Sequence, residues 1–98
     1  MKRPSAIRQR FSNAETLTPG RGNLVGDRVR LARQRRSLTM IETCQLIEQH
    51  SGYAFHQSTL TRIELGTRSV YDFEVAALSL ALDVDARFLL GLVPDDQA

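Results

Sequence analysis

The sequence predicts an all-α protein built from five short helices. From Leu24 onward, apolar residues recur three and four positions apart, which is the spacing of a helix that buries one face. Helix-capping residues and glycines interrupt this pattern at short intervals, and no pair of alternating apolar segments indicates a β-hairpin. The 98 residues are enough for one small domain with a modest core.

The first helix is expected to run from Leu24 to about Arg36. Its apolar stripe consists of Val25, Val29 and Ala32. Asp27 lies near the start of this helix and two arginines lie near its end. Because these charges oppose the partial charges of the helix termini, they favour a helix with these bounds.

The second helix is expected to begin after Thr39, which has the residue type of an N-cap, and Glu42 three positions later completes a capping-box pattern. The core face of this helix would consist of Met40, Thr43, Cys44 and Ile47. The Ser-Gly pair at 51–52 ends it. The third helix is expected to begin near Gln57 and to stop before Gly66, a typical residue just beyond a helix.

The fourth helix is expected over residues 72–82 (DFEVAALSLAL), with Asp72 as its cap. This segment is apolar on nearly all sides, which predicts a central and buried position. Asp85 is expected to cap a short fifth helix that ends at Leu90. Residues 92–98 would then form a short acidic tail.

The third helix has two different faces. On a helical wheel, Thr59, Leu60 and Ile63 point inward. The opposite side carries Gln57, Ser58, Thr61, Arg62 and Leu65. Such hydrogen-bonding groups suit the base edges of a DNA major groove, although an ordinary solvated face has a similar composition. A capped helix, a tight connection and a short helix of this kind together predict a helix-turn-helix, in which the second helix enters the groove.

Three segments resemble the XRE family of helix-turn-helix domains, the lambda repressor and Cro type. They are VGDRVRLARQRRSLT at 25–39, STLTRIELGTRSV at 58–70, and AALSLALDVDARFLLG at 76–91. The middle segment, with its S-x-L-x-x-I-E-x-G pattern, is the most specific of the three. The resemblance covers residues 24–91 and implies a five-helix, lambda-repressor-like DNA-binding domain.

The resemblance also implies a set of DNA contacts. The reading face would be supplied by His56, Gln57, Ser58, Thr61 and Arg62. Thr39 and Met40, at the start of the second helix, would lie against one phosphate, where free helix amides bind anions. Thr67 and Arg68 would lie against another. Arg33 would pair with Glu64 and hold the third helix at its angle.

Several positions depart from the family pattern. Met40 stands in place of the usual glutamine, so only backbone amides would reach that phosphate. Thr43 stands in place of leucine, and its hydroxyl needs a partner in the core. His56 stands in place of a capping serine, which predicts a weak N-cap. About six extra residues separate the second and third helices, and Tyr53 and Phe55 among them are expected to pack over the core.

Charge is unevenly distributed along the chain. Residues 1–23 contain five basic residues and one acid, a net charge of +4, whereas residues 24–98 contain eight arginines and ten acids, a net charge of −2. The first 23 residues also carry prolines and glycines without an apolar period, which predicts a disordered basic arm. Such an arm suits binding to nucleic acid, although a merely solvated tail has the same charge.

Other classes of protein are not indicated. No apolar run reaches the length of about 18 residues that a membrane span needs, and the start lacks the apolar core of a signal peptide. A single cysteine, Cys44, fits a reducing cytoplasm. Cys44, His50 and His56 match no usual zinc spacing. No nucleophile beside a base, paired carboxylates or cofactor motif indicates an enzyme or a small-molecule substrate.

The expected function is therefore that of a transcriptional regulator that binds double-stranded DNA, more simply a repressor than an activator. One such module makes few contacts, so a homodimer that reads two half-sites is expected. Its interface would include part of the apolar cluster formed by Phe88, Leu89, Leu90, Leu92 and Val93. The alternative is a protein-interaction module, such as an antitoxin or an adaptor, that binds a partner through this apolar end.

Overall fold

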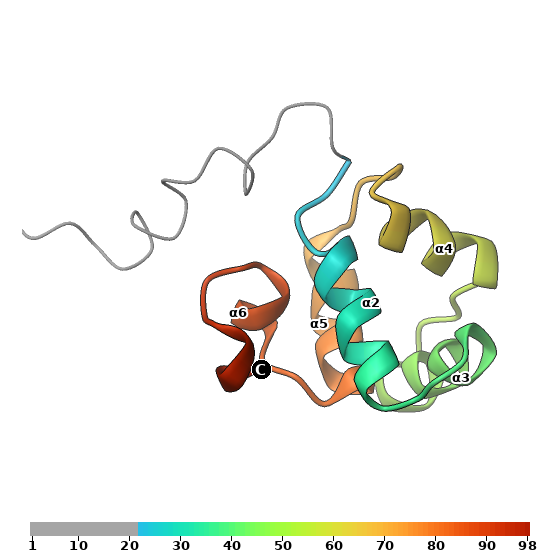
Figure 1. Ribbon diagram of the computed structural model, residues 1–98. Coiled ribbons are helices and arrows are strands. Elements are labelled where there is room, and N and C mark those ends of the chain that lie inside the picture. Colours follow the sequence, from blue (N-terminus) through green and yellow to red (C-terminus); the bar gives the residue numbers. More distant parts are fainter. Residues whose placement is uncertain (1–21) are drawn as a thin grey trace, which may run out of the picture.

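The computed structural model describes residues 22–98, which form helices packed around a single core (Figure 1). The expected disordered arm lies outside the described residues as far as residue 21. The elements are α2 (Gly26–Arg35), α3 (Met40–Ser51), α4 (Gln57–Leu65), α5 (Asp72–Leu82), α6 (Ala86–Leu89) and the 3-10 helix η1 (Asp95–Gln97). Residues 22–98 contain no strand, so the all-α prediction is confirmed for this part of the chain.

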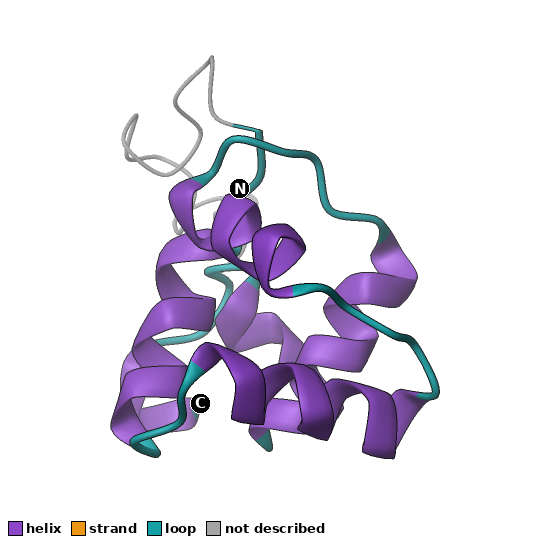
Figure 2. Ribbon diagram, turned by 90° about the vertical axis from the view of Figure 1, so that its right-hand side faces the viewer, coloured by secondary structure: helices purple, strands orange, loops and turns teal. Residues whose placement is uncertain are grey.

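The core lies between α5 and the helices around it. Helix α5 contacts α2, α3 and α6, while α4 packs against α2 and α3. In Figure 1, α5 lies behind α2, with α6 on one side and α3 and α4 on the other. Short loops join the helices (Figure 2). The fully buried apolar side chains are Val29, Ile47, Leu60, Ile63, Leu78, Leu82, Phe88 and Leu89. No helix in the described part of the chain has the length and apolar character of a membrane span.

Helix α2 begins at Gly26, two residues later than expected. The reason is Asn23, whose side-chain oxygen Oδ1 accepts hydrogen bonds from the backbone amides of Val25 at 3.0 Å and Gly26 at 2.8 Å. A side chain that bonds these amides substitutes for the helical partners that they lack. Gly22 and Asn23, which the sequence places in the arm, are thus hydrogen-bonded to the helical domain.

Helix α3 is capped as expected. The amide of Glu42 donates to Thr39 Oγ1 at 3.1 Å, and the amide of Thr39 donates to Glu42 Oε1 at 2.9 Å. The hydroxyl of Thr43, which is fully buried, donates to the carbonyl oxygen of Thr39 at 2.8 Å. This bond is the partner that a hydroxyl in the core needs. The helix ends at Gly52, whose φ of 81° lies in the left-handed region that favours glycine.

Helix α5 differs from its prediction in two respects. Asp72 is its first residue and not its cap, because the amide of Tyr71 donates to Glu74 Oε1 at 2.9 Å and closes the first turn. The helix is also not buried on all sides, since Phe73 and Leu80 are 44% and 58% exposed. The prediction for Phe73 and Leu80 was wrong because an exposed apolar stripe has the same composition as a buried one.

Helix α6 confirms the cap at Asp85, whose Oδ1 accepts the amide of Arg87 at 2.8 Å, but it ends at Leu89 and not at Leu90. Its residues Phe88 and Leu89 are fully buried and close one end of the core. Leu90 and Val93, which follow the helix, are partly buried against the same core.

Candidate nucleic-acid interface

Helix α4 is anchored to the core along one side. Leu60 and Ile63 have no exposed surface, and Glu64 is 5% exposed. At its carboxyl end, Gly66 has a φ of 75°, and its amide donates to the carbonyl oxygen of Ile63 at 3.0 Å. The inward side predicted from the sequence is therefore confirmed for Leu60 and Ile63, and Thr59 beside them is partly buried.

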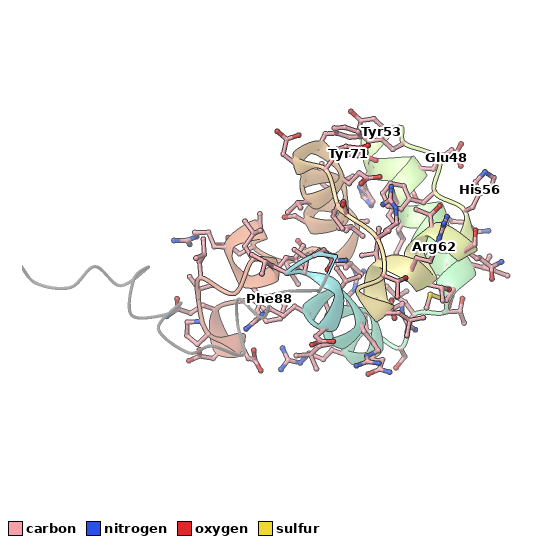
Figure 3. The ribbon with its side chains drawn as sticks, turned by 90° about the horizontal axis from the view of Figure 1, so that it is seen from above. Glu48, Tyr53, His56, Arg62, Tyr71 and Phe88 are labelled. Atoms are coloured by element: carbon pink, nitrogen blue, oxygen red, sulfur yellow. The ribbon has the colours of Figure 1, made fainter. Side chains whose placement is uncertain are left out.

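The opposite side of α4 is open. His56, Gln57, Ser58 and Arg62 are exposed, and Thr61 is partly exposed. Arg62 Nε donates to the carbonyl oxygen of Ser58 at 3.3 Å, so the guanidinium lies along its own helix and pairs with no carboxylate in the described residues. Figure 3 shows His56 and Arg62 on the side of the molecule away from Phe88. The face thus combines an amide, hydroxyls, an imidazole and a guanidinium, which are the groups that read base edges.

An ion pair ties α4 to α2. Arg33 Nε donates to Glu64 Oε2 at 2.7 Å and Arg33 Nη2 donates to Glu64 Oε1 at 2.9 Å, a two-pronged arrangement. Arg33 Nη1 also donates to the carbonyl oxygen of Leu38 at 3.0 Å. The hydrogen bonds to Glu64 raise the pKa of Arg33 above its ordinary value. The pair implied by the family resemblance is present, and it joins α2, the loop before α3 and α4.

The amino end of α3 offers less to a phosphate than expected. Thr39 is exposed, but Met40 is partly buried against the core, so its side chain lies away from solvent. The capping box uses the amide of Glu42, which leaves the amides of Met40 and Ile41 for an anion. Hydrogen bonds with Thr39 lower the pKa of Glu42, so a carboxylate stands at this same helix end and opposes a phosphate there.

Arg68 has a different partner from the one expected. Its guanidinium Nη1 lies 3.1 Å from Glu74 Oε1, and the two side chains are 24% and 9% exposed. The charge expected to neutralise a phosphate is thus already compensated by Glu74, in the first turn of α5. Thr67 is exposed, and its amide donates to the carbonyl oxygen of Arg62 at 3.0 Å, which closes the end of α4.

The start of the described chain is fixed to the end of α4, a feature that the sequence did not reveal. The amide of Gly22 donates to the carbonyl oxygen of Gly66 at 2.7 Å. Asn23 Nδ2 donates to the carbonyl oxygens of Ile63 at 3.1 Å and Arg68 at 2.9 Å. The residue type of Asn23 indicates an N-cap, but no local pattern shows bonds to residues forty positions away. The basic segment before Gly22 therefore joins the domain beside the candidate interface.

Gly26 allows α2 to approach the end of α4 closely. A β-carbon at Gly26 would lie 3.0 Å from the carbonyl oxygen of Glu64 and closer still to that of Ile63. Any larger residue would have to push the two helices apart, because a backbone carbonyl cannot turn aside as a flexible side chain can. Close contact between backbones is a frequent reason for glycine inside a helix.

The connection between α3 and α4, residues 52–56, only partly covers the core. Phe55 packs against the core as expected, whereas Tyr53 is 43% exposed and instead contacts the ring of Phe73.

Beside the start of α4 lies an open hollow of about 240 Å³, lined by Ile41, Cys44, Gln45, Glu48, Phe55, His56 and Gln57. Burial raises the pKa of the Cys44 thiol, which favours a neutral group that packs beside the core.

His56 begins α4 without capping it. Its backbone is extended, with a φ of −81° and a ψ of 153°, but its side chain accepts no hydrogen bond from the first turn. The weak cap predicted from the missing serine is therefore confirmed. As a result the imidazole is directed to solvent beside Gln57 and Ser58.

Comparison of the chain with protein-family models, curated proteins and solved structures found no match. The resemblance to the XRE family therefore stays a prediction that depends on the three sequence segments.

Proposed function

We propose that this chain is a sequence-specific transcriptional regulator that binds double-stranded DNA through α4. The observation that carries the proposal is the division of α4 into two sides. Leu60, Ile63 and Glu64 fix one side to the body of the domain. The other side holds Gln57, Ser58 and Arg62 in solvent. A short rigid helix with exposed amide and guanidinium groups is suited to bidentate contacts in the major groove, with adenine and guanine respectively.

The sources of affinity and of specificity are proposed to be separate. Glu74 compensates Arg68, and the amino end of α3 carries the Glu42 carboxylate. The described surface near α4 therefore supplies few free positive charges. The segment of net charge +4 before residue 24 would supply most of the phosphate neutralisation, and its junction at Gly22 lies at the end of α4.

Occlusion of a promoter is the proposed mode of action, which makes the regulator a repressor. A domain of this size presents one candidate reading helix and needs no further activity to block another protein from the same site. The alternative, an interaction module that uses its apolar carboxyl end, depended on the cluster around Phe88. Phe88 and Leu89 are fully buried, and Leu90, Leu92 and Val93 are partly exposed, so this cluster leaves less apolar surface for a partner than its composition suggests.

Selection from a pool of random duplexes, followed by binding measurements over a range of salt concentrations, tests the proposal. We expect one motif to be enriched and the logarithm of its binding constant to fall linearly with the logarithm of salt concentration. Deletion of residues 2–21 should weaken binding to the selected and a scrambled duplex by the same factor and flatten the salt dependence of both. If no motif is enriched, or if the deletion changes only the selected duplex, the proposal is wrong.

A further inference from the structure

An exposed apolar surface lies on the outer side of α5 and on the connection that follows α3. We call it the aromatic face, and it consists of Tyr53, Tyr71, Phe73, Ala76 and Leu80. The ring of Phe73 lies between the two tyrosines, with centroids 5.0 Å from that of Tyr53 and 5.5 Å from that of Tyr71. In Figure 3, Tyr53 and Tyr71 lie together at one edge of the molecule, and His56 lies at another. The aromatic face is therefore distinct from the open side of α4.

The size of the aromatic face favours a macromolecular partner. Tyr53, Tyr71, Phe73 and Leu80 are 43%, 60%, 44% and 58% exposed. With about 200 Å² for each of these side chains, the face leaves roughly 400 Å² of apolar surface in water. A contiguous patch of this size on a small protein often marks an interaction site. Two such faces together would bury roughly 800 Å² of this apolar surface, so their polar rims must add about 400 Å² to reach the roughly 1,200 Å² of a small specific interface.

We propose that the aromatic face is a twofold interface between two copies of this chain. Phe73, Ala76 and Leu80 are spaced by three and four residues, so they form one stripe along the exposed side of α5. Two such stripes related by a twofold axis cross at Ala76, which is small enough to let the helices approach. Phe73 of each copy then packs against Leu80 of the other, as an isologous interface requires.

This inference rests in part on the proposed function, because a single reading helix makes too few contacts for tight specific binding and a second copy supplies the other half-site. The aromatic face begins at Tyr71, where the connection from α4 ends, so pairing would leave His56, Gln57 and Arg62 open. It is a different surface from the one expected at the carboxyl end, where Phe88 and Leu89 are fully buried and Leu90, Leu92 and Val93 are partly exposed.

The charges around the aromatic face are mixed. Asp72 and Asp83 lie at the two ends of the α5 stripe, and both are exposed. The exposed Arg36 donates to the carbonyl oxygen of Ala81 at 3.0 Å, so a guanidinium stands near the acid at the Asp83 end. Salt screens attraction and repulsion between such exposed charges alike. The dimer is therefore expected to depend little on salt, whereas DNA binding is expected to weaken as salt rises.

Sedimentation equilibrium of the full chain without DNA tests the interface. Leu80→Glu places a charge in the aromatic face, and Leu65→Glu is its matched control, because Leu65 is a leucine on α4 with 63% exposure. We expect a dimer for the wild type and for Leu65→Glu, and at least a hundredfold weaker association for Leu80→Glu. Ala76→Arg should have the same effect as Leu80→Glu, and it changes an exposed helix position without removing any core contact.

Tyrosine fluorescence locates the interface independently of mass. The chain has two tyrosines and no tryptophan, and both tyrosines belong to the aromatic face. Quenching of their emission by acrylamide should decrease as the wild-type protein concentration rises through the dissociation constant, and it should not change for Ala76→Arg. A wild type that is monomeric at several hundred micromolar overturns the proposal, and so does a dimer whose tyrosines stay equally open to acrylamide. Either result leaves the DNA-binding proposal intact, because no DNA is present.

Discussion

The side chain of Arg33 helps to hold α4 in place. It bonds both carboxylate oxygens of Glu64 and the carbonyl oxygen of Leu38, and the two side chains are 14% and 4% exposed. The free-energy cost of removing two such charges from water offsets most of the electrostatic attraction between them, so the pair itself adds little to stability. Removal of one partner, however, leaves the other buried and uncompensated.

Substitution of Glu64→Gln or Arg33→Ala should therefore lower the free energy of unfolding by about 3 kcal/mol. Urea unfolding followed by circular dichroism measures this change. Arg30→Ala is the control, because Arg30 forms a 3.7 Å pair with Asp27 whose side chains are 48% and 57% exposed. Its loss should change stability by less than about 1 kcal/mol. Equal effects of the buried and the exposed substitution would contradict the role given to the pair.

Single residues also show which contacts could be predicted from the sequence and which could not. The Arg33–Glu64 pair could be predicted because the segments that resemble the XRE family imply it, and the Thr39 cap could be predicted because a local motif specifies it. The partner of Arg68 could not be predicted, because a guanidinium pairs equally well with a carboxylate and with a phosphate. The sequence does not show that Glu74 lies close enough to Arg68 to pair with it. Tyr53 and Leu80 were expected inside because apolar composition alone does not distinguish a core stripe from an exposed one.

At the scale of elements, a strongly capped helix, α3, is followed by a weakly capped one, α4. The reciprocal bonds between Thr39 and Glu42 fix the start of α3. The start of α4 has no side-chain cap, because His56 occupies that position. Helix types and approximate ends followed from the sequence. The start of α2 did not. Asn23 accepts the amides of Val25 and Gly26, and it is itself held by bonds to the carbonyl oxygens of Ile63 and Arg68, which are distant in sequence.

His56→Ser should stabilise the protein by about 1 kcal/mol, because a serine hydroxyl accepts the amide bond that the imidazole does not. Thermal unfolding of the wild type, His56→Ser and His56→Ala measures the effect. The alanine variant should resemble the wild type, since neither side chain caps the helix. If serine and alanine have equal stability, the start of α4 is already satisfied by other means and the assignment of a weak cap is wrong.

At the scale of the whole molecule, stability and the proposed DNA binding depend on charge in different ways. The folded body carries ionised carboxylates at helix starts, and the net positive charge precedes it in the chain. Hydrogen bonds from Thr39 lower the pKa of Glu42 below its ordinary 4.5, and the guanidinium and amide of Arg87 lower the pKa of Asp85 below its ordinary 3.8. A lowered pKa in the folded state means that the ionised form is the one that folding favours.

The stabilisation from these two carboxylates should therefore be present above their ordinary pKa values and should be lost as the pH falls through the lowered ones. Melting temperatures between pH 7 and pH 2 for the wild type and the double variant Glu42→Gln, Asp85→Asn measure this dependence. The double variant should be less stable at pH 7 and should lose less stability in acid. Parallel curves for the two proteins would show that other groups control the acid transition.

The central claim is that the open side of α4 reads DNA sequence, and the ratio of binding constants for a selected and a scrambled duplex tests it most directly. Arg62→Ala should weaken binding to the selected duplex by about 1–3 kcal/mol and reduce the ratio, because we propose that Arg62 contacts a base. Arg87→Ala, on α6 at the far side of the molecule from α4 (Figure 1), is the matched control and should leave the ratio unchanged. If Arg62→Ala weakens both duplexes equally, or changes neither, α4 does not read the sequence.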